Sequence, residues 1–214
     1  QEIITDLMYG SSDTTGWSSN IGTWITNCAG NTIFGGYNSW GGGGYASKTY
    51  TGLPTPHYQV TIGIQLFFLD SWDDEYCYVK VDDTTVYQES FNTFNSPVEY
   101  CGRSGEYYKD QIKTVTSTPA AHTDSNLVLM ITTNINEAAS EESFGFNNIQ
   151  IIIDLCHPAC SACNGTTNAD CLSCNPGWFL EGTTCNRTCS LPGKYANSTT
   201  NVCERIQTIC KFIY

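Results

Sequence analysis

The chain has 214 residues, with 9 basic and 21 acidic side chains and a net charge of −12 at pH 7. Aromatic residues make up 13% of it and charged residues 14%, a balance that favours a folded protein over a disordered one. An acidic protein repels phosphate backbones, so we expect no nucleic-acid partner. No apolar run reaches the roughly 18 residues that a membrane helix needs, so we expect no membrane span.

The composition divides the chain into two parts. Residues 1–155 carry 5 basic and 18 acidic side chains, whereas residues 156–214 carry 4 basic and 3 acidic ones and nine of the twelve cysteines. The first part has turn residues at short intervals, and the second has few large apolar residues. We therefore predict an extended arm at 1–15, a folded domain at 16–155 and a small cysteine-rich domain at 156–214.

The N-terminal arm has apolar residues at Ile3, Ile4 and Leu7, followed by a flexible segment at 10–13. An arm of this kind can pair within the sheet of its own molecule. It can also add a strand to a neighbouring molecule, which would build a filament. The sequence leaves both arrangements open.

Apolar residues recur with a period of two in residues 16–155, which predicts strands rather than helices. The alternating segments are 60–68, 77–81, 127–131 and 149–153. Residues 82–85 are predicted to turn a hairpin, and one weak helix is predicted at 136–142. Eight to ten strands separated by Gly, Asn, Asp and Pro predict an all-β fold, a jelly-roll-type β-sandwich.

The most biased segment is 35–45, which contains six glycines and three aromatic residues. Glycine permits positive φ angles and close approach of the backbone. One interpretation is a loop that presents Tyr37, Trp40 and Tyr45 as a platform for stacking sugars. The other is a loop whose aromatic side chains fold back onto the sandwich, and we favour this second interpretation.

Several carboxylates follow the strand at 60–68. Asp70, Asp73 and Glu75 lie within six residues, and Glu142 begins a later strand. Calcium takes six to eight oxygen ligands, many of them carboxylates, so these four residues are a candidate calcium site, although the EF-hand pattern is absent. The alternative is a tight turn in which Asp70 and Asp73 accept backbone hydrogen bonds while Trp72 fills the core.

The sequence contains none of the common signatures of hydrolases or phosphate-binding loops. His57, His122 and His157 are too few and too scattered for a zinc site, and we expect each to be a surface or capping residue. We therefore predict that the protein is not an enzyme and has no organic cofactor.

The cysteines indicate the compartment. Cys160 and Cys163, and Cys171 and Cys174, form two C-x-x-C pairs, which are typical of zinc sites as well as of disulfides. The two pairs are seven residues apart, short of the usual spacer of ~12–20, and further cysteines crowd the same region. Glycosylation acceptors also lie among them, at Asn164, Asn186 and Asn197. We therefore predict disulfides and a secreted protein, extracellular or on a cell surface.

The order of motifs carries a resemblance. A DSWDDE segment at 70–75 follows an alternating strand, ESFGF stands at 142–146, and the tail begins CHPACSAC at 156–163. This order resembles large secreted surface proteins of ciliates and other protists, in which a β-sandwich precedes furin-like cysteine-rich repeats. The resemblance implies an extracellular location and a sandwich followed by a small furin-like or EGF-like module.

The furin-like pattern also implies a pairing of the tail cysteines. The implied pairs are Cys156–Cys163, Cys160–Cys171, Cys174–Cys185 and Cys189–Cys203. We expect Cys28 to pair with Cys101 inside the sandwich. Cys77 and Cys210 are then candidates for a bridge between the two domains or between two molecules.

Our first hypothesis is a non-catalytic extracellular structural protein, a subunit of a glycosylated cell-surface coat or fibril that assembles with itself through the sandwich. The alternative is a lectin-like adhesin that binds glycans with the help of calcium and uses Tyr37, Trp40 and Tyr45 as its platform.

Overall fold

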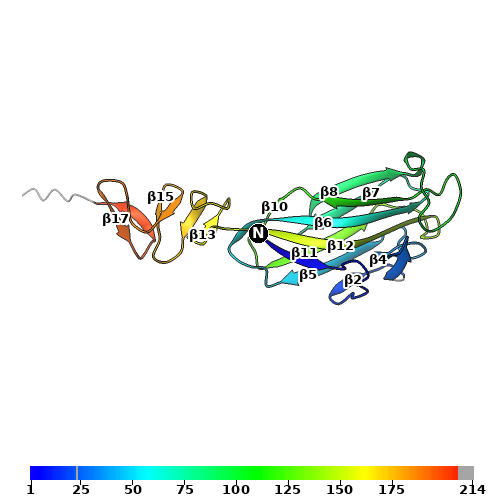
Figure 1. Ribbon diagram of the computed structural model, residues 1–214, viewed down its shortest axis with the longest axis horizontal. Helices are drawn as coiled ribbons and strands as arrows, with labels where there is room; N and C mark the ends of the chain where they lie inside the picture. The colour runs from blue at the N-terminus through cyan, green and yellow to red at the C-terminus, as the bar shows by residue number, and fades with distance from the viewer. Residues whose placement is uncertain (23, 207–214) are drawn as a thin grey trace, which may run out of the picture.

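The computed structural model describes residues 1–22 and 24–206, and its two parts follow one another along one long axis (Figure 1). A sandwich of two β-sheets contains β1 to β12, and a narrow cysteine-rich tail contains β13 to β18. We call the end of the sandwich that joins the tail the proximal end and the opposite end the distal end. The predicted all-β, jelly-roll-type sandwich followed by a small disulfide-rich module is confirmed.

The strands of the sandwich are β1 (Glu2–Asp6), β2 (Trp17–Ser19), β3 (Ile25–Cys28), β4 (Asn31–Gly35), β5 (Tyr45–Thr51), β6 (His57–Asp70), β7 (Asp73–Val81), β8 (Thr84–Asn92), β9 (Gln111–Thr116), β10 (Ala120–Ala121), β11 (Asn126–Thr133) and β12 (Glu142–Leu155). Those of the tail are β13 (Cys160–Cys163), β14 (Cys171–Cys174), β15 (Phe179–Glu181), β16 (Thr184–Asn186), β17 (Lys194–Asn197) and β18 (Val202–Arg205). Within the described residues the one helical segment is a 3-10 turn, η1 (Thr93–Asn95), and no helix has the length and apolar character needed to cross a bilayer.

The longest strands, β6 and β12, pair antiparallel along almost their whole length. Asp70 pairs with Glu142 at the distal end, and His57 pairs with Leu155 at the proximal end. This pair forms the centre of a seven-stranded sheet with the order β10-β6-β12-β4-β3, in which β1 also pairs with β12 and β9 with β6. The facing sheet has the order β2-β5-β11-β7-β8.

The alternating residues of the two sheets meet in one core. Val60, Ile62 and Ile64 of β6 are buried against the facing sheet, as the period of two predicts. Aromatic rings fill the distal half of this core, where Phe34 and Phe146 stack with centroids 5.2 Å apart. The core is therefore continuous from the proximal to the distal end.

The N-terminal residues belong to the sandwich. Residues Glu2–Asp6 form β1, which pairs with 149–153 of β12 in the same molecule, and Leu7 is buried. Lys48 forms an ion pair with Asp6 at 2.8 Å, which fixes the end of the strand. Of the two arrangements left open for the arm, pairing within its own sheet is the one observed.

Two short segments were given a structure from the sequence, and the prediction is confirmed for one and wrong for the other. The hairpin predicted at 82–85 joins β7 to β8, and Asp82 and Asp83 have φ angles of 46° and 66°, as a two-residue hairpin turn requires. The helix predicted at 136–142 is wrong, because this segment is a loop up to Glu142, where β12 begins. The loop packs against the glycine-rich segment 41–44, and this tertiary contact overrides a weak helical preference.

The tail is held together by sulfur. Its buried cluster consists almost entirely of cysteines, with Ala159 and the half-buried Trp178 and Leu180. The described residues contain five disulfides, which join the same pairs that the sequence led us to expect: Cys28–Cys101, Cys156–Cys163, Cys160–Cys171, Cys174–Cys185 and Cys189–Cys203. Because a domain with so few large apolar residues cannot supply enough hydrophobic stabilisation, the disulfides must provide much of it. Five disulfides in one chain indicate folding in an oxidising compartment.

We predict that reduction unfolds residues 156–206 before the sandwich. Each tail disulfide contributes roughly 2–4 kcal/mol, and little else is buried there, whereas the sandwich retains its apolar core. Hydrogen exchange measured by mass spectrometry during a titration with reductant should show the tail amides exchanging first and β6 and β12 remaining protected. Loss of protection in both parts at the same reductant concentration would contradict this account.

Candidate functional site

Three carboxylates lie together at the distal end of the sandwich. Asp73 and Glu75 come from the start of β7, and Glu142 is the first residue of β12. One carboxylate oxygen from each lies within 4.8 Å of those from the other two. Glu142 is 1% exposed and Glu75 is 7% exposed, whereas Asp73 reaches the surface.

The backbone explains why these side chains meet. The register of β7 against β8 shifts between Asp73 and Tyr76, and Asp74 has a φ angle of 93°, which marks a bulge at the start of the strand. The Trp72 indole N–H donates to the carbonyl oxygen of Ser143 at 2.8 Å. This bond holds the start of β12 against the connection between β6 and β7, next to the bulge.

The electrostatics of the cluster are unfavourable for three ionised groups. Burial and the nearby charges of Glu75, Glu137 and Asp73 raise the pKa of Glu142 to about 8. Burial also raises the pKa of Glu75, although its Oε2 accepts a hydrogen bond from the backbone N–H of Asp73 at 2.9 Å. The Oε2 of Glu142 is buried and has no hydrogen-bond partner.

Asp70 is not part of this cluster, which corrects the expected set of four ligands. Its Oδ1 accepts a hydrogen bond from the backbone N–H of Arg103, and its own N–H donates to Oδ1 of Asp110, both at 2.9 Å. The backbone of Asp70 has a φ angle of 70°, outside the range of a regular strand, so its side chain does not follow the alternation of β6. Burial raises the pKa of Asp70 to about 7. As the structural alternative predicted, Trp72 fills the core.

The less favoured interpretation of 35–45, a sugar platform made by Tyr37, Trp40 and Tyr45, does not describe the segment. Trp40 is 0% exposed, and its indole N–H donates to Oγ1 of Thr133 at 3.1 Å. A side chain at position 44 would collide with this indole, because an added Cβ would lie 2.4 Å from Nε1 of Trp40. Tyr37 packs on the outer side of the seven-stranded sheet, and Tyr45 is half-buried. The favoured interpretation, in which the aromatic side chains fold back onto the sandwich, describes the segment correctly.

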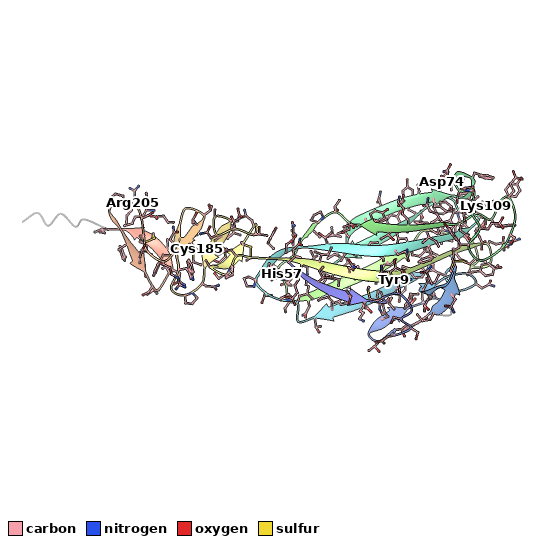
Figure 2. All side chains as sticks on the ribbon, in the orientation of Figure 1. Tyr9, His57, Asp74, Lys109, Cys185 and Arg205 are labelled. Carbon is pink, nitrogen blue, oxygen red and sulfur yellow. A yellow bond between two sulfur atoms is a disulfide. The ribbon has the colours of Figure 1, made fainter. Side chains whose placement is uncertain are left out.

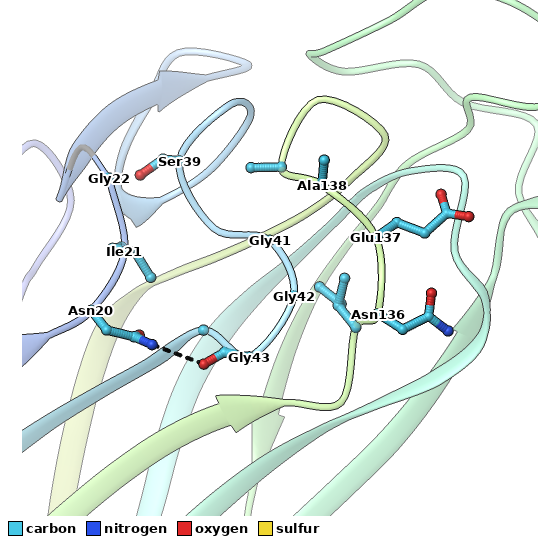
Figure 3. A pocket seen from close by; sticks show the side chains of 13 residues that line it. Asn20, Ile21, Gly22, Ser39, Gly41, Gly42, Gly43, Asn136, Glu137 and Ala138 are labelled. Atoms are coloured by element: carbon cyan, nitrogen blue, oxygen red, sulfur yellow. Dashed lines mark hydrogen bonds between the residues drawn. The ribbon is translucent and has the colours of Figure 1, made fainter.

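A cavity of about 570 Å³ lies beside this segment (Figure 3). Its walls are mainly the backbone of 41–44 and 135–139, and Nδ2 of Asn20 donates to the carbonyl oxygen of Gly43 at 3.0 Å. Gly41 allows the two loops to approach, since a Cβ there would lie 2.4 Å from the backbone nitrogen of Ala139. The cavity is therefore preformed and polar, and none of its lining residues is aromatic.

The segment 93–110 is a distal feature that the sequence reasoning missed. The Cys28–Cys101 disulfide ties it to β3, and Oδ2 of Asp110 accepts the backbone N–H groups of Tyr100 and Cys101. The Arg103 guanidinium lies 4.0 Å from the centre of the Tyr108 ring. The segment nevertheless exposes three aromatic side chains to solvent: Phe94, Tyr100 and Tyr107. The sequence does contain a signal for this segment, namely a long connection that is rich in aromatic residues and surrounds Cys101.

His57 and His122 are buried against one another at the proximal end, so the expectation of surface residues is wrong for both. Nε2 of His57 lies 2.8 Å from Nδ1 of His122, and the outer ring nitrogens face the carbonyl oxygens of Pro54 and Asn126. Burial lowers the pKa of His57, and Oδ2 of Asp82 lies 3.2 Å from Nε2 of His122.

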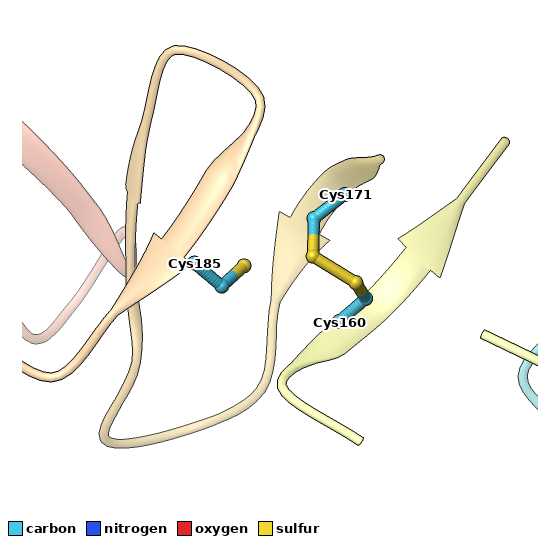
Figure 4. A group of neighbouring side chains, drawn as sticks. All are labelled: Cys160, Cys171 and Cys185. Atoms are coloured by element: carbon cyan, nitrogen blue, oxygen red, sulfur yellow. A yellow bond between two sulfur atoms is a disulfide. The ribbon is translucent and has the colours of Figure 1, made fainter. Parts of the chain in front are cut away.

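Cys77 is a buried free thiol on β7, which corrects the prediction that it forms a bridge. It belongs to the core of the sandwich, and burial raises its pKa to about 12. Cys210, its expected partner, lies outside the described residues. In the tail, Cys160 and Cys171 are bonded to each other, and their neighbour Cys185 is bonded to Cys174, so no thiolate remains in this group for zinc (Figure 4).

The three glycosylation acceptors lie at or just after the ends of short tail strands. Asn164 is exposed after β13, and Asn186 and Asn197 are half-buried at the ends of β16 and β17. His157 is half-buried at the junction, where Nδ1 is 3.1 Å from the backbone nitrogen of Ala159 and caps the turn as expected. Figure 2 shows the side chains of both parts and the labelled Cys185 within the tail.

No family model matches the sequence, and no curated protein matches it. Among solved structures, the chain is similar to the xylan-binding CBM22-1 domain of Xyn10C from Paenibacillus barcinonensis, with a TM-score of 0.45, 11% identity and coverage of 73% of this chain and 97% of that one. The C-terminal CBM6 of LamC from Zobellia galactanivorans gives a TM-score of 0.36 and 11% identity, over 71% and 99% of the two chains. The insecticidal delta-endotoxin Cry8Ea1 from Bacillus thuringiensis gives a TM-score of 0.38 and 18% identity. The match covers 58% of this chain and only 20% of the toxin.

We predict that, in the presence of a chelator, the protein loses stability as the pH rises from about 5 to about 8. The folded pKa values of Glu142 and Asp70 lie above the ordinary values for these acids, so in this window the folded state binds more protons than the unfolded state. Urea denaturation at several pH values measures the slope, and Glu142→Gln should reduce it. A stability that rises with pH over this range, or an unchanged slope in the variant, would count against the burial of a carboxyl group without a partner.

Proposed function

We propose that the chain is a non-catalytic extracellular structural protein, a subunit of a glycosylated coat or fibril. The observation that carries this proposal is the distribution of exposed apolar side chains along the long axis of the molecule. Among the described residues, three of them lie on the segment 93–110 at the distal tip and four on the tail, at opposite ends of the molecule, and five lie elsewhere on the sandwich. Exposed aromatic groups on a rigid support are typical of protein contact surfaces.

The distal segment is well suited to such a contact. A connection this long without strands is uncommon in a compact domain and is usually functional. The Cys28–Cys101 disulfide and the hydrogen bonds to Asp110 hold its backbone, so little entropy is lost when its aromatic side chains bind. Phe94 and Tyr107 support each other edge to face, with centroids 5.6 Å apart.

The tail also exposes apolar side chains to solvent. Its exposed apolar residues are Leu172, Leu191, Tyr195 and Ile206. The first 155 residues have 18 acidic and 5 basic side chains, whereas residues 156–214 have 3 acidic and 4 basic ones. Two acidic sandwiches repel each other, so contact between the sandwich of one copy and the tail of the next is electrostatically favoured. A heterologous contact of this kind that does not close into a ring gives a fibril.

We predict that the double variant Phe94→Ser, Tyr107→Ser abolishes assembly. Loss of an aromatic residue at the centre of a contact typically costs about 2 kcal/mol, roughly thirtyfold in affinity. Negative-stain microscopy and analytical ultracentrifugation of the glycosylated protein provide the readout. The matched control is Tyr9→Ser, because Tyr9 and Tyr107 are both 59% exposed and Tyr9 lies on the flank of the sandwich (Figure 2). Polymers that survive the double variant, or that the control also abolishes, would reject this contact surface.

The cavity of about 570 Å³ beside 41–44 favours a second candidate function, glycan binding by a lectin-like adhesin. Its volume and polar backbone lining suit a saccharide, although Trp40, the central residue of the aromatic platform considered from the sequence, is buried. A glycan array probed with monomeric protein tests this candidate. Binding that Asn20→Ala weakens would support it, whereas an array without signal would leave the structural proposal as the better account.

A further inference from the structure

The cluster at the distal end lacks the partner that its charges require. The side chains of Glu75 and Glu142 are more than nine-tenths buried, and their oxygens converge with one from Asp73 within 4.8 Å. Burying an ionised carboxylate without compensation is costly, and burying two beside a third is more so. No lysine or arginine of the described chain forms an ion pair with any of the three.

A second observation points to a ligand at this place. Glu142 is only 1% exposed, and its carboxylate faces those of Asp73 and Glu75. Its Oε2 atom has neither a hydrogen-bond partner nor contact with solvent. Nearly all buried polar atoms in folded proteins have a partner. A cation bound by all three side chains would satisfy this oxygen and offset the mutual repulsion.

The chemistry of the donors selects the cation. All three donors are carboxylate oxygens, which suit a hard cation rather than zinc or copper. They lie within 4.8 Å of one another, so one ion can contact all three. Calcium accepts oxygen ligands in flexible geometry, whereas magnesium demands a near-ideal octahedron and usually keeps several waters, so a site with three protein carboxylates favours calcium. Because Asp73 is at the surface, solvent water can complete the coordination shell.

We propose that Asp73, Glu75 and Glu142 bind one calcium ion, which ties the start of β7 to the start of β12. The ion would connect the two sheets of the sandwich at the distal end, since β7 and β12 belong to different sheets. Its position next to Trp72 and the loop before Glu142 means that it would order the loops there. This site does not depend on the assembly proposed above, because every ligand comes from one molecule.

The test is calcium binding to the chelator-treated full-length protein under conditions in which it is monomeric. Isothermal titration calorimetry should give one site, and thermal unfolding should shift upward in millimolar calcium. Glu142→Gln should weaken binding by about tenfold or more, because it removes one of three charged ligands. If that variant fails to fold, Asp73→Asn at the surface provides the same comparison.

The matched control is Asp74→Asn, which removes an equal charge from the neighbouring exposed residue and leaves the three ligands in place. Calcium affinity in this control should stay within about twofold of the parent protein. The proposal is overturned if the protein shows no calcium binding at millimolar concentration, if Glu142→Gln and Asp74→Asn behave alike, or if magnesium binds as tightly as calcium. Failure of assembly with intact calcium binding would count against the fibril alone.

Discussion

The antiparallel pairing of β6 with β12 is the constraint on which the rest of the molecule depends. Both strands are 14 residues long, so the pair extends about 45 Å and sets the length of the sandwich. One end of the pair brings Glu142 to the connection between β6 and β7, where the carboxylate cluster forms, and the other end releases the chain into the tail. A shift of this pairing by one residue would turn every buried isoleucine of β12 toward the opposite face. The apolar alternation on both strands therefore fixes the positions of the distal loops and of the tail.

Much of this fold follows from the sequence because its signals are local. Alternation with a period of two is strong in β6, β11 and β12, and the hairpin at Asp82 needs only two residues that tolerate positive φ. The tail cysteines could be paired because the resemblance supplied a pattern that spacing alone does not contain. The burial of Trp40 was the favoured interpretation, but the contacts that produce it, with Gly44 and with Thr133, which is distant in sequence, could not be derived from the sequence. Asp70 was assigned to the wrong group for a similar reason, since a positive φ and the partner Asp110 turn it toward the segment 93–110.

The two parts of the molecule are stabilised by different interactions. The sandwich buries a continuous apolar core, which allows it to accommodate unfavourable features such as the carboxylates at the distal end and a buried histidine pair at the proximal end. The tail has no comparable core and relies on cross-links that restrict its unfolded state. Strain or unpaired charge would be much harder to tolerate in the tail. Sites that bind ions or small ligands are therefore expected in the sandwich, and the tail is better suited to the role of a stiff spacer that also carries apolar contact residues.

The location of the acidic groups links this division to the proposed extracellular setting. A sandwich with 18 acidic and 5 basic side chains is destabilised by its own charge, and most strongly where carboxylates are buried close together. Calcium is abundant outside cells, where binding constants in the range of about 10⁻⁴ to 10⁻³ M are sufficient for occupancy. A weak site made of three carboxylates is therefore adequate there and would be largely empty in the cytosol. An extracellular compartment that keeps the tail cysteines oxidised would, on the calcium proposal, also supply the counter-ion for the distal cluster, and both parts would then reach full stability only there.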